Sequence, residues 1–173
     1  MRVLAVVTAA AALTCLVTGR LQAQPAEAAF LERFRGTWQG GGTVRRSIDP
    51  SPWNVRCVLS GVPGPNSISM QGTCTGALIV QRQIGAELAF DPRARVYRGV
   101  YIGARVGPAS LAGTRGGDVV ALTITWPAPV AGDTRAYLTI HNRGDGTLRI
   151  VTEDNLVPGG PTQQTSNLLL QRR

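Results

Sequence analysis

One histidine, His141, is the only side chain of this 173-residue chain that offers an imidazole for catalysis or metal binding. Hydrolysis by a serine–histidine–aspartate arrangement would have to use it, and no nucleophile-elbow sequence accompanies it. Axial ligation of a haem iron would need a histidine that points into the fold. Strand alternation instead places His141 on the face of Tyr137 and Thr139, opposite the apolar Leu138 and Ile140. We therefore predict an exposed histidine at the end of a strand.

The carboxylates do not predict catalysis either. Glycoside hydrolysis needs two acids that face one cleft, whereas most acids here lie at turn signals, where Asp is favoured by local hydrogen bonding. The acids in question are Glu87, Asp91, Asp118, Asp133, Asp145, Glu153 and Asp154. Arg143-Gly144-Asp145 is interpreted as a hairpin turn, and no Gly-rich stretch follows a strand and opens a helix as a phosphate loop does. The sequence predicts neither an enzyme nor a bound cofactor.

Cys57 and Cys74 are the two cysteines outside the N-terminal apolar run. Each falls on the apolar face of an alternating strand, and the two are equidistant from the turn at Pro65-Asn66. Cysteines in an oxidising compartment usually pair, so we predict a disulfide across this hairpin, with two unpaired buried thiols as the alternative. The loop it closes has a length for which chain entropy gives roughly 3 kcal/mol. Because zinc normally takes four ligands, no metal site is predicted.

The N-terminus has the three-part layout of a secretory signal peptide. Met1-Arg2 carries a positive charge, residues 3–17 form a nearly unbroken apolar run, and small residues suited to cleavage end at Ala23, or alternatively at Ala28. The run is shorter than the roughly 20 residues that span a bilayer, although a retained anchor helix is the competing interpretation. The pattern predicts a periplasmic or secreted protein of a bacterium.

Cleavage after residues 1–23 would leave one domain, residues 24–173, without a transmembrane segment. Cys15 lies inside the apolar run and is predicted to leave with the signal peptide, rather than to carry a lipid. All 18 basic residues are arginines, and without Arg2 and Arg20 the 16 that remain face 10 acids, a net charge of about +6. The arginines do not cluster in the sequence, so no nucleic acid partner is predicted. A solvated surface, anionic lipid headgroups, polysaccharide or an acidic partner fit this charge.

Turn residues at short intervals predict an all-β domain after a short helix at residues 25–35. Pro25 suits the start of that helix and Gly36 ends it. The predicted strands are residues 37–46, 53–60, 67–80, 87–90, 96–102, 110–113, 119–126, 135–142, 147–152 and 166–171. The Gly40-Gly41-Gly42 run would weaken a strand unless the backbone bends sharply or packs closely there, as at the corner of a barrel.

Phe34-Arg35-Gly36-Thr37-Trp38, after a short helix and at the start of the first strand, resembles the opening of the lipocalins and the wider calycin group. The resemblance implies one antiparallel β-barrel of about eight strands, with Trp38 at the closed end against Arg172 or Arg173 of the last strand. The nearest rival fold is a two-sheet sandwich. An outer-membrane barrel is a less favoured alternative, because it would need an outward apolar band with aromatic girdles that the strand pattern does not show. The chain also resembles uncharacterised exported proteins of alphaproteobacteria.

Two functions are compatible with such a barrel. In the first, an exported non-enzymatic barrel encloses a small apolar ligand, as barrels of roughly eight strands can. Alternation then names the candidate wall residues Trp53, Met70, Tyr97, Tyr101 and Trp126. In the second, the barrel is filled and acts as a protein-interaction module or protease inhibitor on an envelope protein. The analogy is with the bacterial metalloprotease inhibitors, in which an extended N-terminal segment enters the protease cleft.

Overall fold

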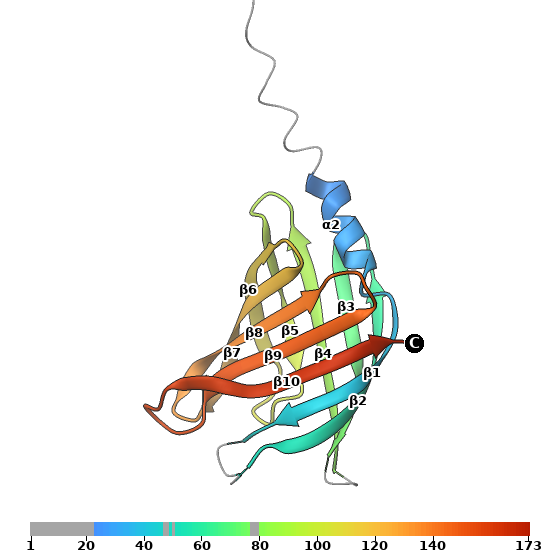
Figure 1. The fold of residues 1–173 in the computed structure, drawn as a ribbon. Coiled ribbons are helices and arrows are strands. Elements are labelled where there is room, and N and C mark those ends of the chain that lie inside the picture. Colours follow the sequence, from blue (N-terminus) through green and yellow to red (C-terminus); the bar gives the residue numbers. More distant parts are fainter. Residues whose placement is uncertain (1–22, 47–48, 50, 77–79) are drawn as a thin grey trace, which may run out of the picture.

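The computed structural model describes residues 23–46, 49, 51–76 and 80–173, which form one helix and ten strands. The strands make a single closed antiparallel sheet, in which each strand pairs with its neighbours in the chain and β1 pairs with β10 (Figure 1). This confirms the predicted all-β barrel with a short N-terminal helix. In chain order the elements are α2 (Ala23–Glu32), β1 (Gly36–Val44), β2 (Trp53–Pro63), β3 (Ser67–Gly76), β4 (Val80–Asp91), β5 (Val96–Ile102), β6 (Ala109–Gly116), β7 (Val119–Val130), β8 (Asp133–Asn142), β9 (Thr147–Asn155) and β10 (Thr162–Arg172).

The prediction of about eight strands is wrong, because the described residues contain ten. Ten strand segments can be counted in the sequence, and the smaller number came from the resemblance to lipocalins. The largest boundary errors concern β3 and β4. Residues 67–80 were predicted as one strand and residues 87–90 as the next, whereas β3 ends at Gly76 and β4 begins at Val80. Residues 77–79 are Ala-Leu-Ile and include none of the Gly, Pro, Asn or Asp residues that mark turns.

β1 and β10 close the barrel along seven paired positions, and this single closed sheet excludes the two-sheet sandwich. Glycine permits the closure. A Cβ atom on Gly40 would collide with the backbone carbonyl of Leu169, and one on Gly42 would collide with that of Asn167. The glycine run is therefore a place of close strand packing.

Alternation along the strands gives the wall an apolar inner face. On β3, Ile68, Met70 and Cys74 are buried, whereas Gln71 is exposed. Cys57 lies directly opposite Cys74 in the ladder of β2 and β3, with both side chains on the inner face, and the two form the predicted disulfide. The pair forms because the hairpin places the two cysteines in register.

Helix α2 covers one end of the barrel (Figure 1). Phe30, Leu31 and Phe34 are almost completely buried against the barrel interior. The helix begins slightly earlier than predicted. It also ends earlier, because the N–H groups of Arg33 and Phe34 donate to carbonyls three residues back and so tighten the last turn. No described helix is long and apolar enough to cross a membrane.

Trp38 is fully buried beside the helix at this closed end. Its indole N–H donates to the Phe34 carbonyl at 2.9 Å, and the Arg172 guanidinium lies 4.9 Å from the ring centroid. Arg172 also donates to the carbonyl of Arg33. A Cβ atom on Gly61 would collide with the Phe34 carbonyl, so glycine lets the chain cross β2 here. This contact between Trp38 and Arg172 of the last strand is the arrangement that the resemblance to lipocalins implies.

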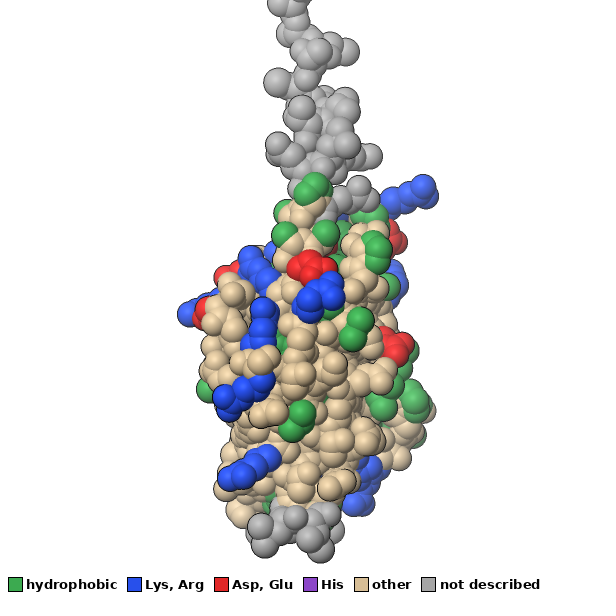
Figure 2. Space-filling model, turned by 90° about the vertical axis from the view of Figure 1, so that its right-hand side faces the viewer, with side chains coloured by type: hydrophobic (Ala, Val, Ile, Leu, Met, Phe, Trp, Pro, Cys, Tyr) green, Lys and Arg blue, Asp and Glu red, His purple; other side chains and the backbone are tan. Residues whose placement is uncertain are grey.

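The outer surface carries its charge in scattered arginines. Figure 2 shows one side of the barrel, where arginines are spread over the face and hydrophobic side chains stand singly or in small groups. Val58, Val62 and Leu169 are among the exposed apolar residues of the outer wall. The buried apolar residues line the interior of the barrel, which also encloses an apolar cavity.

Candidate ligand-binding cavity

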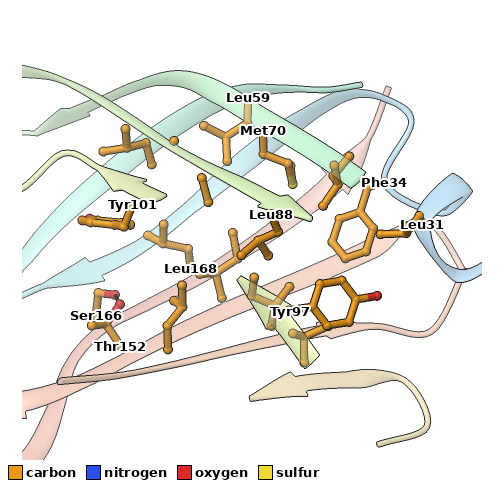
Figure 3. Close-up of a pocket in the computed structure, with 18 of the residues that line it drawn as sticks. Leu31, Phe34, Leu59, Met70, Leu88, Tyr97, Tyr101, Thr152, Ser166 and Leu168 are labelled. Atoms are coloured by element: carbon orange, nitrogen blue, oxygen red, sulfur yellow. Dashed lines mark hydrogen bonds between the residues drawn. The ribbon is translucent and has the colours of Figure 1, made fainter. Parts of the chain in front are cut away.

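An apolar cavity lies inside the barrel, behind helix α2 (Figure 3). The volume open to the centre of a water-sized sphere is about 80 Å³, and a single water needs roughly 10–15 Å³ on this measure. Inward residues of the strands form the wall, among them Leu59, Met70 and Leu168, and Leu31 and Phe34 form the floor. No charged side chain is among the described residues that line it. The cavity is therefore suited to an uncharged, apolar group.

Three of the polar side chains that line this cavity, Ser166, Thr152 and Tyr97, have partners within the protein. The Ser166 hydroxyl donates to Thr152 Oγ1 at 2.9 Å, and the Tyr97 hydroxyl donates to a carboxylate oxygen of Glu27. A buried polar group costs free energy unless it is hydrogen-bonded. Because these groups are already paired, an apolar occupant would leave none of them newly unsatisfied.

The opposite end of the barrel is an open mouth with a volume of about 550 Å³. Ile84, Tyr101, Ser166 and Leu168 line both the mouth and the inner cavity, so the two spaces adjoin. In Figure 3 the side chains of Tyr101 and Ser166 lie at the end of the cavity away from Phe34. The barrel is thus closed by α2 at one end and accessible at the other.

Four of the five predicted wall residues line this interior space. Met70 and Tyr97 line the inner cavity, Tyr101 lines both parts, and Trp126 lines the mouth. The rings of Tyr101 and Trp126 meet edge to face, with centroids 5.9 Å apart. Trp53 lies elsewhere, in a side pocket of about 110 Å³ beside the mouth, with the Arg46 guanidinium 4.5 Å from its ring centroid.

Sequence reasoning missed the floor of the cavity. The spacing of Phe30, Leu31 and Phe34 within the predicted helix does not say which surface these residues cover. Sequence reasoning also missed the open mouth, because its arginines come from segments that are far apart in the chain. Strand alternation identifies the inner face, but it does not say how far along the barrel axis a residue lies.

Glu27 anchors α2 to the barrel wall. Its side chain is buried, and it accepts hydrogen bonds from Arg115 Nε and Nη2 at 2.9 and 2.8 Å and from the Tyr97 hydroxyl. Burial, the largest single influence, opposes ionisation, but the hydrogen bonds from Arg115 and Tyr97 and the charge of Arg115 outweigh it and lower the pKa of Glu27. Burial, and then the hydrogen bond to Glu27 and its charge, raise the pKa of Tyr97. The helix is therefore held by an ionised carboxylate.

Asp154 is a second buried carboxyl group, at the mouth. Burial raises its pKa, the nearby Asp133 adds to this, and hydrogen bonds from the Asn155 N–H and the Trp126 indole oppose it. Trp126 Nε1 donates to Asp154 Oδ2 at 3.1 Å, which fixes the indole at the edge of the mouth. Both oxygens of this carboxyl group are thus engaged within the protein.

The interior space is suited to enclosing a molecule rather than to acid–base or metal chemistry. His141 lies on the outer face of β8, because its neighbour Ile140 is buried on the inner face. Among the described residues, no group of three His, Cys, Asp or Glu side chains is placed to hold a metal ion. What the geometry offers is an apolar chamber with a polar, basic rim.

No known protein family matches the sequence, and no curated protein matches it. The fold is similar to the crystal structure of Rv2717c from M. tuberculosis, with a TM-score of 0.64 and 16% sequence identity. The match covers 89% of this chain and 97% of that one. At this identity the similarity concerns the fold, a closed barrel of comparable size.

Proposed function

We propose that this protein is an exported, non-enzymatic barrel of lipocalin-like type that binds a small apolar molecule in its interior. The observation that carries the proposal is the cavity of about 80 Å³ without a charged lining residue, adjoining an open mouth of about 550 Å³. Ligand sites are typically concave, mostly apolar and largely preformed, with a few placed polar groups. The signal-peptide pattern and the Cys57–Cys74 disulfide support an oxidising location outside the cytoplasm.

The protease-inhibitor alternative has less support. It needs an N-terminal segment that is free to extend into a protease cleft. Here residues 23–32 form a helix, and its Phe30 and Leu31 are buried against the barrel while Glu27 pairs with Arg115. Extending this segment would expose those apolar side chains and break the ion pair, at a cost in stability.

The proposal is tested by filling the cavity. Ala86 of β4 lines it, so an Ala86→Phe variant is expected to occupy the space that a ligand would use. The neutral fluorescent probe N-phenyl-1-naphthylamine should bind the wild-type protein with saturable affinity, and Ala86→Phe should weaken that binding by at least tenfold, the equivalent of about 1.4 kcal/mol.

Ala89→Phe is the matched control, because Ala89 lies on the same strand but is exposed on the outer wall. This variant should bind the probe as the wild-type protein does. Equal probe binding by all three proteins would place the probe on the outer surface and contradict the proposal. Absence of probe binding by the wild-type protein would favour a filled barrel that acts through its surface.

A further inference from the structure

Four arginines surround the open mouth. Arg45 and Arg46 follow the end of β1, Arg82 lies near the start of β4, and Arg105 lies between β5 and β6, and all four line the same space. One acidic residue, Asp154, is among the described residues of that lining, and its oxygens are already engaged. The rim is therefore strongly basic, although its members are far apart in the sequence.

Of these four arginines, only Arg46 forms an ion pair among the described residues, and the charge of Arg105 also acts on the same carboxylate, Asp49. Arg46 pairs with Asp49 at 2.6 Å. Among the described residues, neither Arg82 nor Arg105 has a carboxylate oxygen within the 4.0 Å of an ion pair, and the Arg45 Nε atom is buried without a hydrogen-bond acceptor. A buried donor without an acceptor is destabilising, so an anion in the mouth that accepts a hydrogen bond from Arg45 Nε would be favoured.

The basic mouth and the apolar cavity lie one after the other along the barrel, so each would hold a different part of an elongated ligand. Arg82, Ile84, Ala86 and Leu88 alternate along the inner face of β4, from the basic rim to the apolar chamber. At roughly 3.3 Å per residue this row extends for about 20 Å, which exceeds the length of an extended ten-carbon chain. Tyr101 lies at the junction of the two spaces. Burial raises the pKa of its hydroxyl, and the charge of Arg82 opposes this shift.

We propose that the mouth holds the anionic headgroup of a single-chain amphiphile whose apolar tail lies in the inner cavity. The inference rests on the proposed function and adds the class of ligand to it. The guanidinium groups of Arg82 and Arg105 donate to the headgroup, as arginine does to carboxylates, and the tail displaces water from the chamber. A cationic headgroup would meet like charge at the rim.

Three probes with one ten-carbon tail test this proposal: sodium decanoate, 1-decanol and decyltrimethylammonium. Isothermal titration at low ionic strength should show decanoate binding at least about fivefold more tightly than decanol, with decyltrimethylammonium the weakest of the three. Arg82→Gln and Arg105→Gln should each weaken decanoate binding by about fivefold and leave decanol binding unchanged. Added salt should reduce only the preference for decanoate.

Arg56→Gln is the matched control, because the substitution removes the same charge. Arg56 lies on the outer face of β2 near the same end of the barrel. This variant should bind decanoate as the wild-type protein does. Equal affinity for decanoate and decanol, or unchanged decanoate binding in both rim variants, would overturn the inference and leave the proposed function standing. Displacement of decanoate by equimolar acetate would also overturn it, since the mouth would then bind a free anion. If neither decanoate nor decanol binds, the proposed function itself fails.

Discussion

Glu27 makes a buried polar contact between the closing helix and the barrel wall. It belongs to the helix, whereas its partners Tyr97 and Arg115 belong to β5 and β6, so one carboxylate joins α2 to the wall. Removing one member of a buried ion pair leaves the other charge uncompensated, which usually costs about 3–5 kcal/mol. The cost here is smaller, because the Arg115 side chain is 21% exposed.

We expect Glu27→Gln to lower the free energy of unfolding at pH 7 by about 2 kcal/mol. Since the pKa of Glu27 is lowered below its ordinary value of 4.5, its contribution is present above that value and is lost as the pH falls through the lowered pKa. The stability difference between the wild-type and variant proteins should therefore shrink below about pH 4.5. Urea unfolding at a series of pH values measures it.

Glu32→Gln supplies the comparison for that experiment. Glu32 lies on the same helix and pairs with Arg35, but both side chains are more than half exposed. Exposed pairs contribute little to stability, so this variant should unfold nearly as the wild-type protein does. A pH-independent difference for Glu27→Gln would show that the carboxylate charge does not hold the helix.

Single residues were predictable where neighbours along the strand decide their surroundings. The disulfide followed from alternation and from the symmetric placement of Cys57 and Cys74 about a turn. The interior position of Met70 followed in the same way, whereas Trp53 was placed on the wall and lies in a side pocket. The basic rim could not be foreseen, because it joins residues that only the closed barrel brings together.

At the scale of elements, α2 is the part whose position matters most for the cavity. It closes the floor with Phe30 and Leu31 and is anchored through Glu27. A chain that begins at residue 24 keeps this anchor, and a chain that begins at residue 29 loses it.

Two truncated proteins test the role of this element. The protein that begins at residue 29 should be less stable than the one that begins at residue 24 by at least the cost of Glu27→Gln, about 2 kcal/mol. It should also bind the neutral naphthylamine probe more weakly, because the floor of the cavity is no longer held. Equal stability and equal probe binding in the two proteins would show that the anchored helix neither stabilises the barrel nor supports ligand binding.

Elements were predictable where turn residues separate them. The helix and most strands were located correctly within a few residues. The boundary between β3 and β4 was missed, because the apolar residues 77–79 continue the strand-like pattern. The number of strands was visible in the sequence, and the resemblance to lipocalins led to a smaller one.

At the scale of the whole molecule, the barrel combines a closed end with an open one. The helix seals the apolar chamber, and the opposite mouth carries the charge and most of the accessible volume. This difference between the two ends supports the proposal that the barrel binds a single elongated molecule. It depends on closure of the sheet by β1 and β10, which only the three-dimensional structure shows.

Native mass spectrometry tests the central claim, an interior that binds an apolar molecule. The protein is measured as purified, after organic extraction, and after equilibration with 1-decanol, with Ala86→Phe measured alongside. We expect the wild-type protein, with a mass two hydrogens below that of the reduced chain, to carry one decanol per molecule and Ala86→Phe to carry none. An adduct present on purification and lost on extraction would identify the natural ligand. A wild-type protein that remains bare after equilibration with decanol would contradict the account.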